Sequence, residues 1–393
     1  MTRVERIKNW FRERVKIPIG VTIAVCILPA VLTGLYYILR PSRAAMDWVS
    51  IYISAPIRHV LGLLSSVYPF SVMEVLATFA VIFFIYYIVK AIRDTSRRRG
   101  KWKLLGKRLL PVLVVGLYIW AAFSWLWNSG HHATGFAERY GFTNHGIAVE
   151  ELVSVTAMFA DRANELSVQV ERDEDGRFVE NRREMFAAST GIFENISREF
   201  PSLQGRLFTP KPMIFSWLMS ITGYSGMYFA LTGEALINTQ PSGVFMPATV
   251  AHEHAHQLGV FAEDEATFVG ILASIKSDDV VFQYAGYMSG LSWLLNALAG
   301  ADADAWFEIT GSLTDEVVRD RAEAFEFWAM RTISDLGIGF IDNILTNIME
   351  AASDAVDAIY DAYLRAQGQE LGIRSYGAGV DLIVQYFTRR NGS

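Results

Sequence analysis

The sequence predicts a mainly α-helical membrane protein: three N-terminal transmembrane helices followed by a helical domain with one small β-hairpin. Hydrophobic residues make up 52% of the 393 residues, which is high for a soluble protein. Three nearly uncharged runs occupy the first third of the chain. Beyond them, apolar residues recur with the spacing of amphipathic helices. We therefore expect a membrane domain over residues 1–128 and a second domain over residues 129–393.

Each predicted span is long enough for a helix to cross a bilayer, which needs about 20 apolar residues. The spans cover residues 17–39, 71–89 and 109–128, and only Glu74 interrupts the second one. The third run is rich in tryptophan at its far end, as interfacial belts are. The first run has no convincing cleavage site, so we interpret it as an uncleaved anchor.

Basic residues predict the orientation of the spans. Residues 1–16 carry six Lys or Arg, and residues 90–108 carry nine against one acidic residue. Both segments should face the cytoplasm by the positive-inside rule. The third span then delivers residues 129–393 to the extracytoplasmic side of the cell membrane. The arginine cluster at 97–99 fits this topology better than nucleic-acid binding, because it lies between two spans.

Charge changes sign along the chain. Residues 1–108 have a net charge of +13 and the remaining residues −19. The acidic second part argues against nucleic-acid partners and against docking on anionic lipid. The single cysteine, Cys26, lies in the first span, so the chain forms no internal disulfide.

Two further apolar segments could be mistaken for spans. Residues 48–70 contain Pro56, Arg58 and Pro69, which favours an interfacial or re-entrant element. Residues 280–299 carry no charge but have several polar residues and no basic flank. A buried helix of the second domain is the preferred interpretation, and a fourth span is the alternative.

The second domain is expected to be mostly helical. Residues 147–170, 180–200 and 315–366 show apolar spacing near 3.6. The exception is a predicted hairpin, with strands at 226–231 and 235–238 around Thr232-Gly233-Glu234. Its strand before residue 240 would offer an edge to an extended peptide. An irregular core loop is the alternative.

The most specific motif is His252-Glu253-x-x-His256, which matches H-E-x-x-H. Residues four apart on a helix lie on one face, so both imidazoles can bind one metal ion, and Glu253 can take a proton from its water. Zinc is the expected cofactor, because it favours imidazole and needs one more protein ligand. The alternative is a solvated or structural histidine pair. Pro247 predicts the helix start and Gly259 its end, while His254 should point away from the pair.

Two glutamates are candidates for the third ligand. Glu263 shares a face of the next predicted helix with small residues, which would let two helices approach closely; these are Ala266, Thr267, Gly270 and Ser274. Glu265 lies on the bulkier face, with Phe268, Val269 and Leu272. The periodicity favours Glu263 and leaves Glu265 as the alternative.

Several blocks resemble a bacterial family of membrane-anchored, zincin-like proteins catalogued as a domain of unknown function. The blocks are Thr232-Gly233-Glu234-Ala235, His252-Glu253-x-Ala255-His256-Gln257-x-Gly259, Glu263-Asp264-Glu265-Ala266, Tyr284-Ala285-Gly286-Tyr287 and Ser375-Tyr376-Gly377. The resemblance covers nearly the whole chain. That family is in turn similar to the gluzincin metallopeptidases, so the resemblance implies a zincin-like second domain, hydrolysis and a glutamate as third ligand. Thr267 stands where membrane gluzincins often have Asp, which puts the usual contact to a ligand histidine in doubt.

These observations predict a membrane-anchored zinc metallopeptidase that hydrolyses peptide bonds of a peptide or protein substrate, with Glu253 as the base. The oxyanion needs a further donor, for which the candidates are Tyr284, Tyr287, Arg374 and Tyr376. Glu234 and Asn238 are candidates for lining the cleft, with a polar role at a strand end as the alternative. The alternative function is a membrane sensor or receptor that retains an inactive metallopeptidase fold. A structural zinc site is disfavoured, since the second domain has no cysteine.

Overall fold

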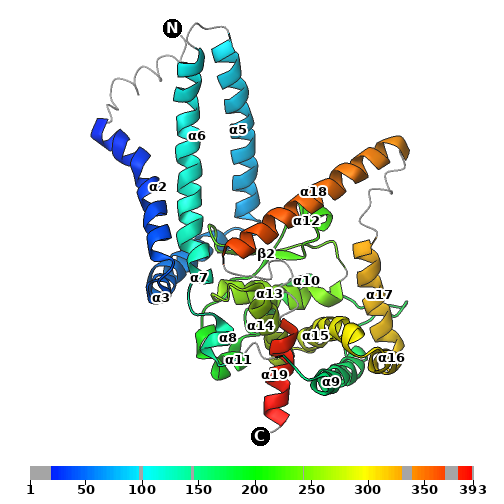
Figure 1. The fold of residues 1–393 in the computed structure, drawn as a ribbon. Coiled ribbons are helices and arrows are strands. Elements are labelled where there is room, and N and C mark those ends of the chain that lie inside the picture. Colours follow the sequence, from blue (N-terminus) through cyan, green and yellow to red (C-terminus); the bar gives the residue numbers. More distant parts are fainter. Residues whose placement is uncertain are drawn as a thin grey trace.

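The computed structural model describes residues 19–96, 101–142, 146–241, 243–329, 339–367 and 379–391. It is mainly helical with one small sheet, as predicted. Three long helices stand side by side and extend from a globular region formed by residues 129–391 (Figure 1). The chain is therefore a membrane protein whose apolar helices project from one side of a folded domain.

The three long helices are α2 (Ile19–Leu39), α5 (Val72–Ser96) and α6 (Lys101–Phe123), the last continuing into η2 (Ser124–Asn128). They contain candidate spans with mean hydropathies of 2.1, 2.3 and 2.0, and most of their apolar side chains are exposed. This agrees with the predicted spans, although α5 continues past residue 89. Its backbone hydrogen bonds run on into the charged segment, because a helix need not end where the hydrocarbon layer does. Which side of the membrane carries the globular region stays a prediction.

The segment between the first two spans is helical but is not among the candidate spans. It comprises α3 (Arg43–Val49), η1 (Ser50–Ser54) and α4 (Ala55–Ser66). One face of α4 is buried against the globular region through Arg58, Gly62 and Ser65. Its other face exposes large apolar side chains, as expected for the interfacial element predicted over residues 48–70.

The core of the globular region is built from helices α9 (Val149–Ser167), α13 (Met246–Gln257), α14 (Glu263–Lys276), α15 (Val280–Ala301) and α19 (Gly379–Asn391). Helix α15 corresponds to the uncharged run 280–299. Its Phe282, Met288 and Leu291 are fully buried against neighbouring helices, so it is a core helix of the globular region and not a fourth span.

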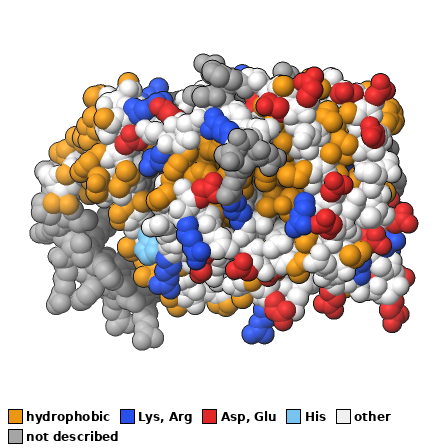
Figure 2. All heavy atoms as spheres, turned by 90° about the horizontal axis from the view of Figure 1, so that it is seen from below, with side chains coloured by type: hydrophobic (Ala, Val, Ile, Leu, Met, Phe, Trp, Pro, Cys, Tyr) orange, Lys and Arg blue, Asp and Glu red, His pale blue; other side chains and the backbone are white. Residues whose placement is uncertain are grey.

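Further helices surround this core: α7 (Ser129–His131), α8 (Phe136–Arg139), α10 (Arg182–Ala188), α11 (Glu194–Glu199), η3 (Pro201–Leu203), α12 (Ser216–Thr222), η4 (Gly243–Phe245), α16 (Ala303–Gly311), α17 (Asp315–Ala329) and α18 (Gly339–Ala366). The prediction of one helix over 180–200 was wrong, since a turn around Gly191 separates α10 from α11. The predicted helix 315–366 corresponds to α17 and α18, which flank residues outside the described part. Charged side chains are spread over the face opposite the spans (Figure 2).

The sheet has three short strands in the order β1-β3-β2. Strands β2 (Gly226–Phe229) and β3 (Glu234–Ile237) form the predicted antiparallel hairpin, and Gly233 takes a positive φ of 68° in its turn. Strand β1 (Lys211–Pro212), which was not predicted, pairs parallel to β3. In the described sheet β2 is an outer strand, so one of its edges is unpaired.

Two buried carboxylates join the second span to the globular region. Glu234 accepts hydrogen bonds from the backbone N–H groups of Val72 and Met73 at the start of α5, and it pairs with Lys211 at 2.7 Å. Glu74, on the first turn of α5, accepts from Ile214 N and Phe215 N, both at 2.8 Å. Glu234 therefore has the second of the two roles expected for it, a polar contact at a strand end, and it stabilises the start of a span.

Candidate metal centre

Helix α13 presents two histidines on one face, as the motif predicts. Pro247 lies in its first turn, and Gly259 just beyond it has a φ of 95°, a conformation that favours glycine at a helix end. His252 and His256 are one helical turn apart. Their ring centroids are separated by 4.7 Å and their planes by 89°. Both imidazoles can therefore direct a nitrogen toward one point.

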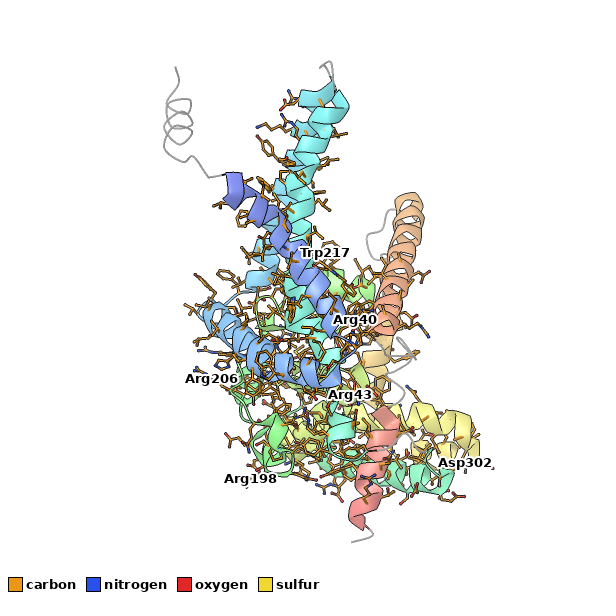
Figure 3. The ribbon with its side chains drawn as sticks, turned by 60° about the vertical axis from the view of Figure 1, so that its left-hand side comes forward. Arg40, Arg43, Arg198, Arg206, Trp217 and Asp302 are labelled. Carbon is orange, nitrogen blue, oxygen red and sulfur yellow. The ribbon has the colours of Figure 1, made fainter. Side chains whose placement is uncertain are left out.

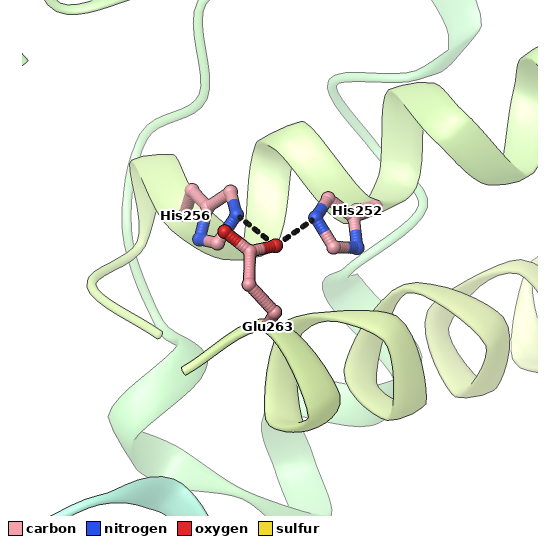
Figure 4. A group of neighbouring side chains, drawn as sticks. All are labelled: His252, His256 and Glu263. Atoms are coloured by element: carbon pink, nitrogen blue, oxygen red, sulfur yellow. Dashed lines mark hydrogen bonds and ion pairs between the residues drawn. The ribbon is translucent and has the colours of Figure 1, made fainter. Parts of the chain in front are cut away.

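Glu263 completes a three-residue cluster from the first turn of α14. Its Oε2 lies 3.1 Å from His252 Nε2 and 3.4 Å from His256 Nε2 (Figure 4). The three ligand atoms lie within 4.8 Å of one another. Atoms bonded to a tetrahedral zinc ion at about 2.0–2.2 Å lie about 3.3–3.6 Å apart. The two oxygen–nitrogen distances lie close to this range, so two imidazoles and a carboxylate could hold a divalent ion such as zinc here.

The second nitrogen of each ring has its own partner. The Nδ1 atom of His256 lies 2.7 Å from the Val260 carbonyl oxygen, to which it donates a hydrogen bond. The Nδ1 atom of His252 lies 3.3 Å from Thr267 Oγ1. Such contacts hold the ring orientation and leave each Nε2 directed at Glu263, where it could bind a metal ion. Membrane gluzincins often have Asp in the place of Thr267, which put the contact to a ligand histidine in doubt. The Thr267 hydroxyl nevertheless makes this contact, to His252.

Charge in the cluster is balanced between the carboxylate and the imidazoles. Burial disfavours the charged form of Glu263, yet the two histidines hold the pKa of its carboxyl well below its usual range. Burial likewise disfavours the charge of His256, but the Glu263 carboxylate raises its pKa to about 9. In the metal-free protein the pair therefore shares a proton that a cation would displace.

The two helices that carry the cluster pack very closely. A Cβ atom on Gly270 of α14 would lie 2.7 Å from His252 N and 2.9 Å from His252 Cα, both backbone atoms of α13. Only glycine permits this approach. The small-residue face inferred from the sequence is therefore the face that brings Glu263 to the histidines.

Glu253 lies beside the cluster and faces a cavity of about 420 Å³. Burial raises the pKa of its carboxyl, and its Oε2 has no hydrogen-bond partner among the described residues. The cavity is also lined by Gly226 of β2, whose Cα is so close that an added Cβ would lie 2.7 Å from Glu253 Oε1. A buried acid thus adjoins both the cluster and strand β2.

Several predicted residues lie elsewhere. Glu265 is not part of the cluster, because its carboxylate accepts hydrogen bonds from Phe136 N and Ala137 N at the start of α8. The expectation that Tyr284 serves the site was wrong. Its hydroxyl donates to Asp320 at 2.6 Å in a buried network with Arg172.

Tyr287 is also engaged elsewhere, since its ring packs on Phe159 and under Arg162 at 5.1 and 5.7 Å. His254 points away from the cluster toward Ser189. The other two candidates, Arg374 and Tyr376, lie outside the described residues. Asn238 donates to Ser220 Oγ and to the Tyr224 carbonyl, and it lines a second cavity that shares Gly223, Ser225 and Thr249 with the first.

Two residues at the centre were not predicted. The Tyr360 hydroxyl, from α18, donates to Glu263 Oε1 at 2.5 Å. The Trp127 indole, from the end of the third span, packs edge-on against His256 at 5.3 Å. Neither could have been found by spacing, because they lie more than 90 residues from the motif and no local periodicity links them to it.

Comparison with known proteins identifies one family. Residues 50–384 match the model of a family described as a protein of unknown function, DUF3810. The match extends from η1 into α19 and includes the whole histidine and glutamate cluster. No curated protein and no solved structure matches the chain.

Proposed function

The chain belongs to the DUF3810 family, and from the geometry of its metal centre we propose that it is a membrane-anchored, zincin-like zinc metallopeptidase acting on the extracytoplasmic side. One observation carries the proposal. The His252, His256 and Glu263 ligand atoms converge next to a buried Glu253 that faces a cavity with one oxygen unpartnered among the described residues. A structural zinc site would need no such acid, because its four positions are filled by protein ligands.

Each residue of the centre has a separate role. Zinc held by His252, His256 and Glu263 would supply a more acidic water molecule and polarise the scissile carbonyl. Glu253 accepts a proton from the attacking water and transfers it to the leaving amine. Burial supports this role, since it raises the pKa of the Glu253 carboxyl toward the range suited to a base that must later act as an acid.

Arg374 and Tyr376 stay candidates for the oxyanion donor, and we add Tyr360 in place of Tyr284 and Tyr287. The Tyr360 hydroxyl is hydrogen-bonded to Glu263 and therefore adjoins the cluster. To serve this role the Tyr360 hydroxyl would turn its proton from Glu263 to the oxyanion. Strand β2, which has an unpaired outer edge in the described sheet, lines the cavity through Gly226 beside Glu253. An extended peptide that pairs with this edge would pass the cluster with its backbone carbonyls near the base.

The test compares the full-length protein with Glu253→Gln in lipid nanodiscs loaded with zinc. A randomised peptide library is incubated with each, and cleavage products are identified by mass spectrometry. The variant should keep its zinc, because Glu253 is not a ligand, and lose at least about 100-fold in cleavage rate, as expected for removal of a general base. Glu308→Gln is the matched control, since it makes the same change on an exposed residue of α16.

Two outcomes contradict the proposal. Equal cleavage by both forms would mean that Glu253 does no chemistry. Zinc binding without cleavage by the unmodified protein would favour the alternative, a membrane sensor or receptor with an inactive metallopeptidase fold.

A further inference from the structure

The metal centre lies next to the end of the third span. The candidate span runs from Arg108 to His131. A hydrocarbon layer about 30 Å thick takes about 20 helical residues at 1.5 Å each, and 20 residues counted from Arg108 reach Trp127. The Trp127 indole packs on His256 and on Phe261, at 5.3 and 5.1 Å. One metal-ligating residue thus contacts the side chain that ends the hydrocarbon-spanning part of α6.

The second span independently indicates where the globular region meets the hydrocarbon layer. Glu74 lies on the first turn of α5 and accepts hydrogen bonds from the backbone at the start of α12. Helix α12 therefore begins at the height at which α5 enters the membrane. The end of α12 forms part of the cavity wall, since Thr222, Gly223 and Tyr224 line the cavity.

The elements at this level expose a set of large apolar side chains, which we name the apolar platform. Their exposed fractions run from 38% for Phe215 to 76% for Val67. The members are Ile57, Val60, Leu63, Leu64, Val67, Ile214, Phe215, Trp217 and Leu218. The two parts of the platform, on and just after α4 and on and just before α12, both adjoin the start of α5.

The platform carries no exposed Lys, Arg, Asp or Glu. Over residues 55–67 and 214–222 the only such residue is Arg58, which is buried and lies over the Phe261 ring at 4.8 Å. Trp217 lies on the side of the globular region from which the spans rise, whereas Arg198 and Asp302 lie at the opposite end (Figure 3). Exposed apolar patches of this kind mark interaction surfaces. Because the platform is continuous with the spans, the fitting partner is the bilayer that the spans cross.

We infer that the apolar platform is seated in the outer boundary of the bilayer, so that the metal cavity opens at the level of the lipid headgroups. Its substrates are then polypeptides tethered in the same membrane, cleaved close to the point where they leave it. The substrate part of this inference rests on the proposed peptidase function, whereas the seating of the platform does not.

The first experiment measures the depth of the platform without reference to activity. Spin labels are attached to Trp217→Cys and Val67→Cys in a Cys26→Ser background, and the full-length protein is placed in liposomes. Phe307→Cys is the matched control, because Phe307 is an exposed aromatic residue on α16. Labels at 217 and 67 should relax with dissolved oxygen and resist a water-soluble nickel complex, and the label at 307 should do the reverse.

Two results of this experiment would overturn the seating. The labels at 217 and 67 could be as accessible to nickel as the control. Alternatively, short distances between labels on two molecules, measured by dipolar spectroscopy, would show that a second copy of the chain covers the platform.

The second experiment tests the substrate class. A randomised ten-residue segment is joined to a transmembrane helix through a spacer of either 5 or 40 residues, and both fusions are reconstituted with the protein. Five extended residues reach about 17 Å at most. If the cavity lies at headgroup level, the protein should cleave the short-spacer fusion at least as fast as the long-spacer fusion. It should cleave both at least about tenfold faster than the soluble segment at equal bulk concentration.

The outcomes separate the two proposals. Cleavage of the long-spacer fusion alone, or equal cleavage of the soluble segment, would refute the membrane-level cavity and leave the peptidase function intact. No cleavage of any substrate, with the labels still in lipid, would refute the peptidase function and the substrate class while the seating stands. Glu253→Gln should cleave none of them.

Discussion

At the scale of single residues, two glutamates in the first turn of α14 have different roles. Glu263 faces the histidines and holds their Nε2 atoms at 3.1 and 3.4 Å. Glu265 turns to the start of α8 and accepts two backbone hydrogen bonds. Two residues along a helix correspond to a rotation of about 200°, so the two side chains necessarily serve opposite faces.

This division predicts that Glu263→Gln and Glu265→Gln differ in zinc binding. Glu263→Gln removes an anionic ligand and should weaken zinc affinity by at least about 100-fold, the upper range for loss of partners around a metal. Glu265→Gln should leave affinity within about threefold, since the Glu265 carboxylate bonds to the backbone of α8 and is not part of the cluster. Competition with a chromogenic chelator measures both. Equal losses in the two variants would contradict the assignment of the third ligand.

The shared proton of the His256 and Glu263 pair predicts opposite pH responses of the metal-free and zinc-loaded protein. The pKa of His256 is raised to about 9, so its contribution to stability is complete below its ordinary value near 6.5 and is lost as pH rises to about 9. The metal-free protein should therefore unfold at a lower temperature at pH 9 than at pH 7. Zinc needs the neutral imidazole, so its apparent affinity should rise about tenfold per pH unit up to pH 9.

Thermal unfolding in detergent, with and without a fixed free zinc concentration, gives both trends. A metal-free unfolding temperature that does not change between pH 7 and pH 9 would contradict the shared proton. Glu263→Gln serves as the control, because loss of the carboxylate removes the main contact that raises the pKa of His256, which should therefore fall.

At the scale of elements, the site depends on the distance between α13 and α14. Gly270 lies against the backbone of α13 at His252, so the helix axes can approach far enough for Glu263 to reach both rings. The turn between the helices also matters, because Val260 within it fixes the His256 ring.

We expect Gly270→Ala to separate the two helices. Its Cβ would lie 2.7 Å from a backbone atom that cannot rotate away, so the free energy of unfolding should fall by about 1–3 kcal/mol, as for other overpacked sites. Zinc affinity should fall as well. Gly300→Ala in α15 is the matched control, since nothing lies within 4 Å of its added Cβ. An unchanged zinc affinity in Gly270→Ala would show that the close approach is not needed.

At the scale of the whole molecule, the membrane domain is part of the site. Trp127 from η2 packs on His256, and Arg58 from α4 donates to the His256 carbonyl oxygen at 3.5 Å. The carboxylates of Glu74 and Glu234 then lock α5 to the sheet and α12. The spans are therefore packed into the centre and do not act only as a tether.

It follows that a chain restricted to residues 129–393 should bind zinc at least about tenfold more weakly than the full-length protein, the lower range for lost support around a metal. A chain that lacks only residues 1–41 should keep its affinity, since α4, η2 and Trp127 remain. Isothermal titration with zinc in detergent distinguishes them. Full affinity in the 129–393 chain would reduce the spans to an anchor.

Much of this molecule could be predicted from local sequence. Uncharged runs of about 20 residues identified the three spans, because a bilayer imposes a length and a polarity on any segment that crosses it. The H-E-x-x-H motif and the small-residue face of α14 identified the three clustered ligands, since helical periodicity alone decides which side chains share a face. Even the hairpin before α13 followed from its turn residues.

Only the tertiary structure decided which distant residues complete the site. Tyr284 and Tyr287 had the right chemistry but lie in the core, whereas Tyr360 and Trp127 reach the cluster from elements far away in the chain. Helical periodicity in the sequence relates only residues that lie a few positions apart. Contacts across elements arise from how whole faces pack, and the position of the histidine and glutamate cluster beside the end of the third span is a property of that packing.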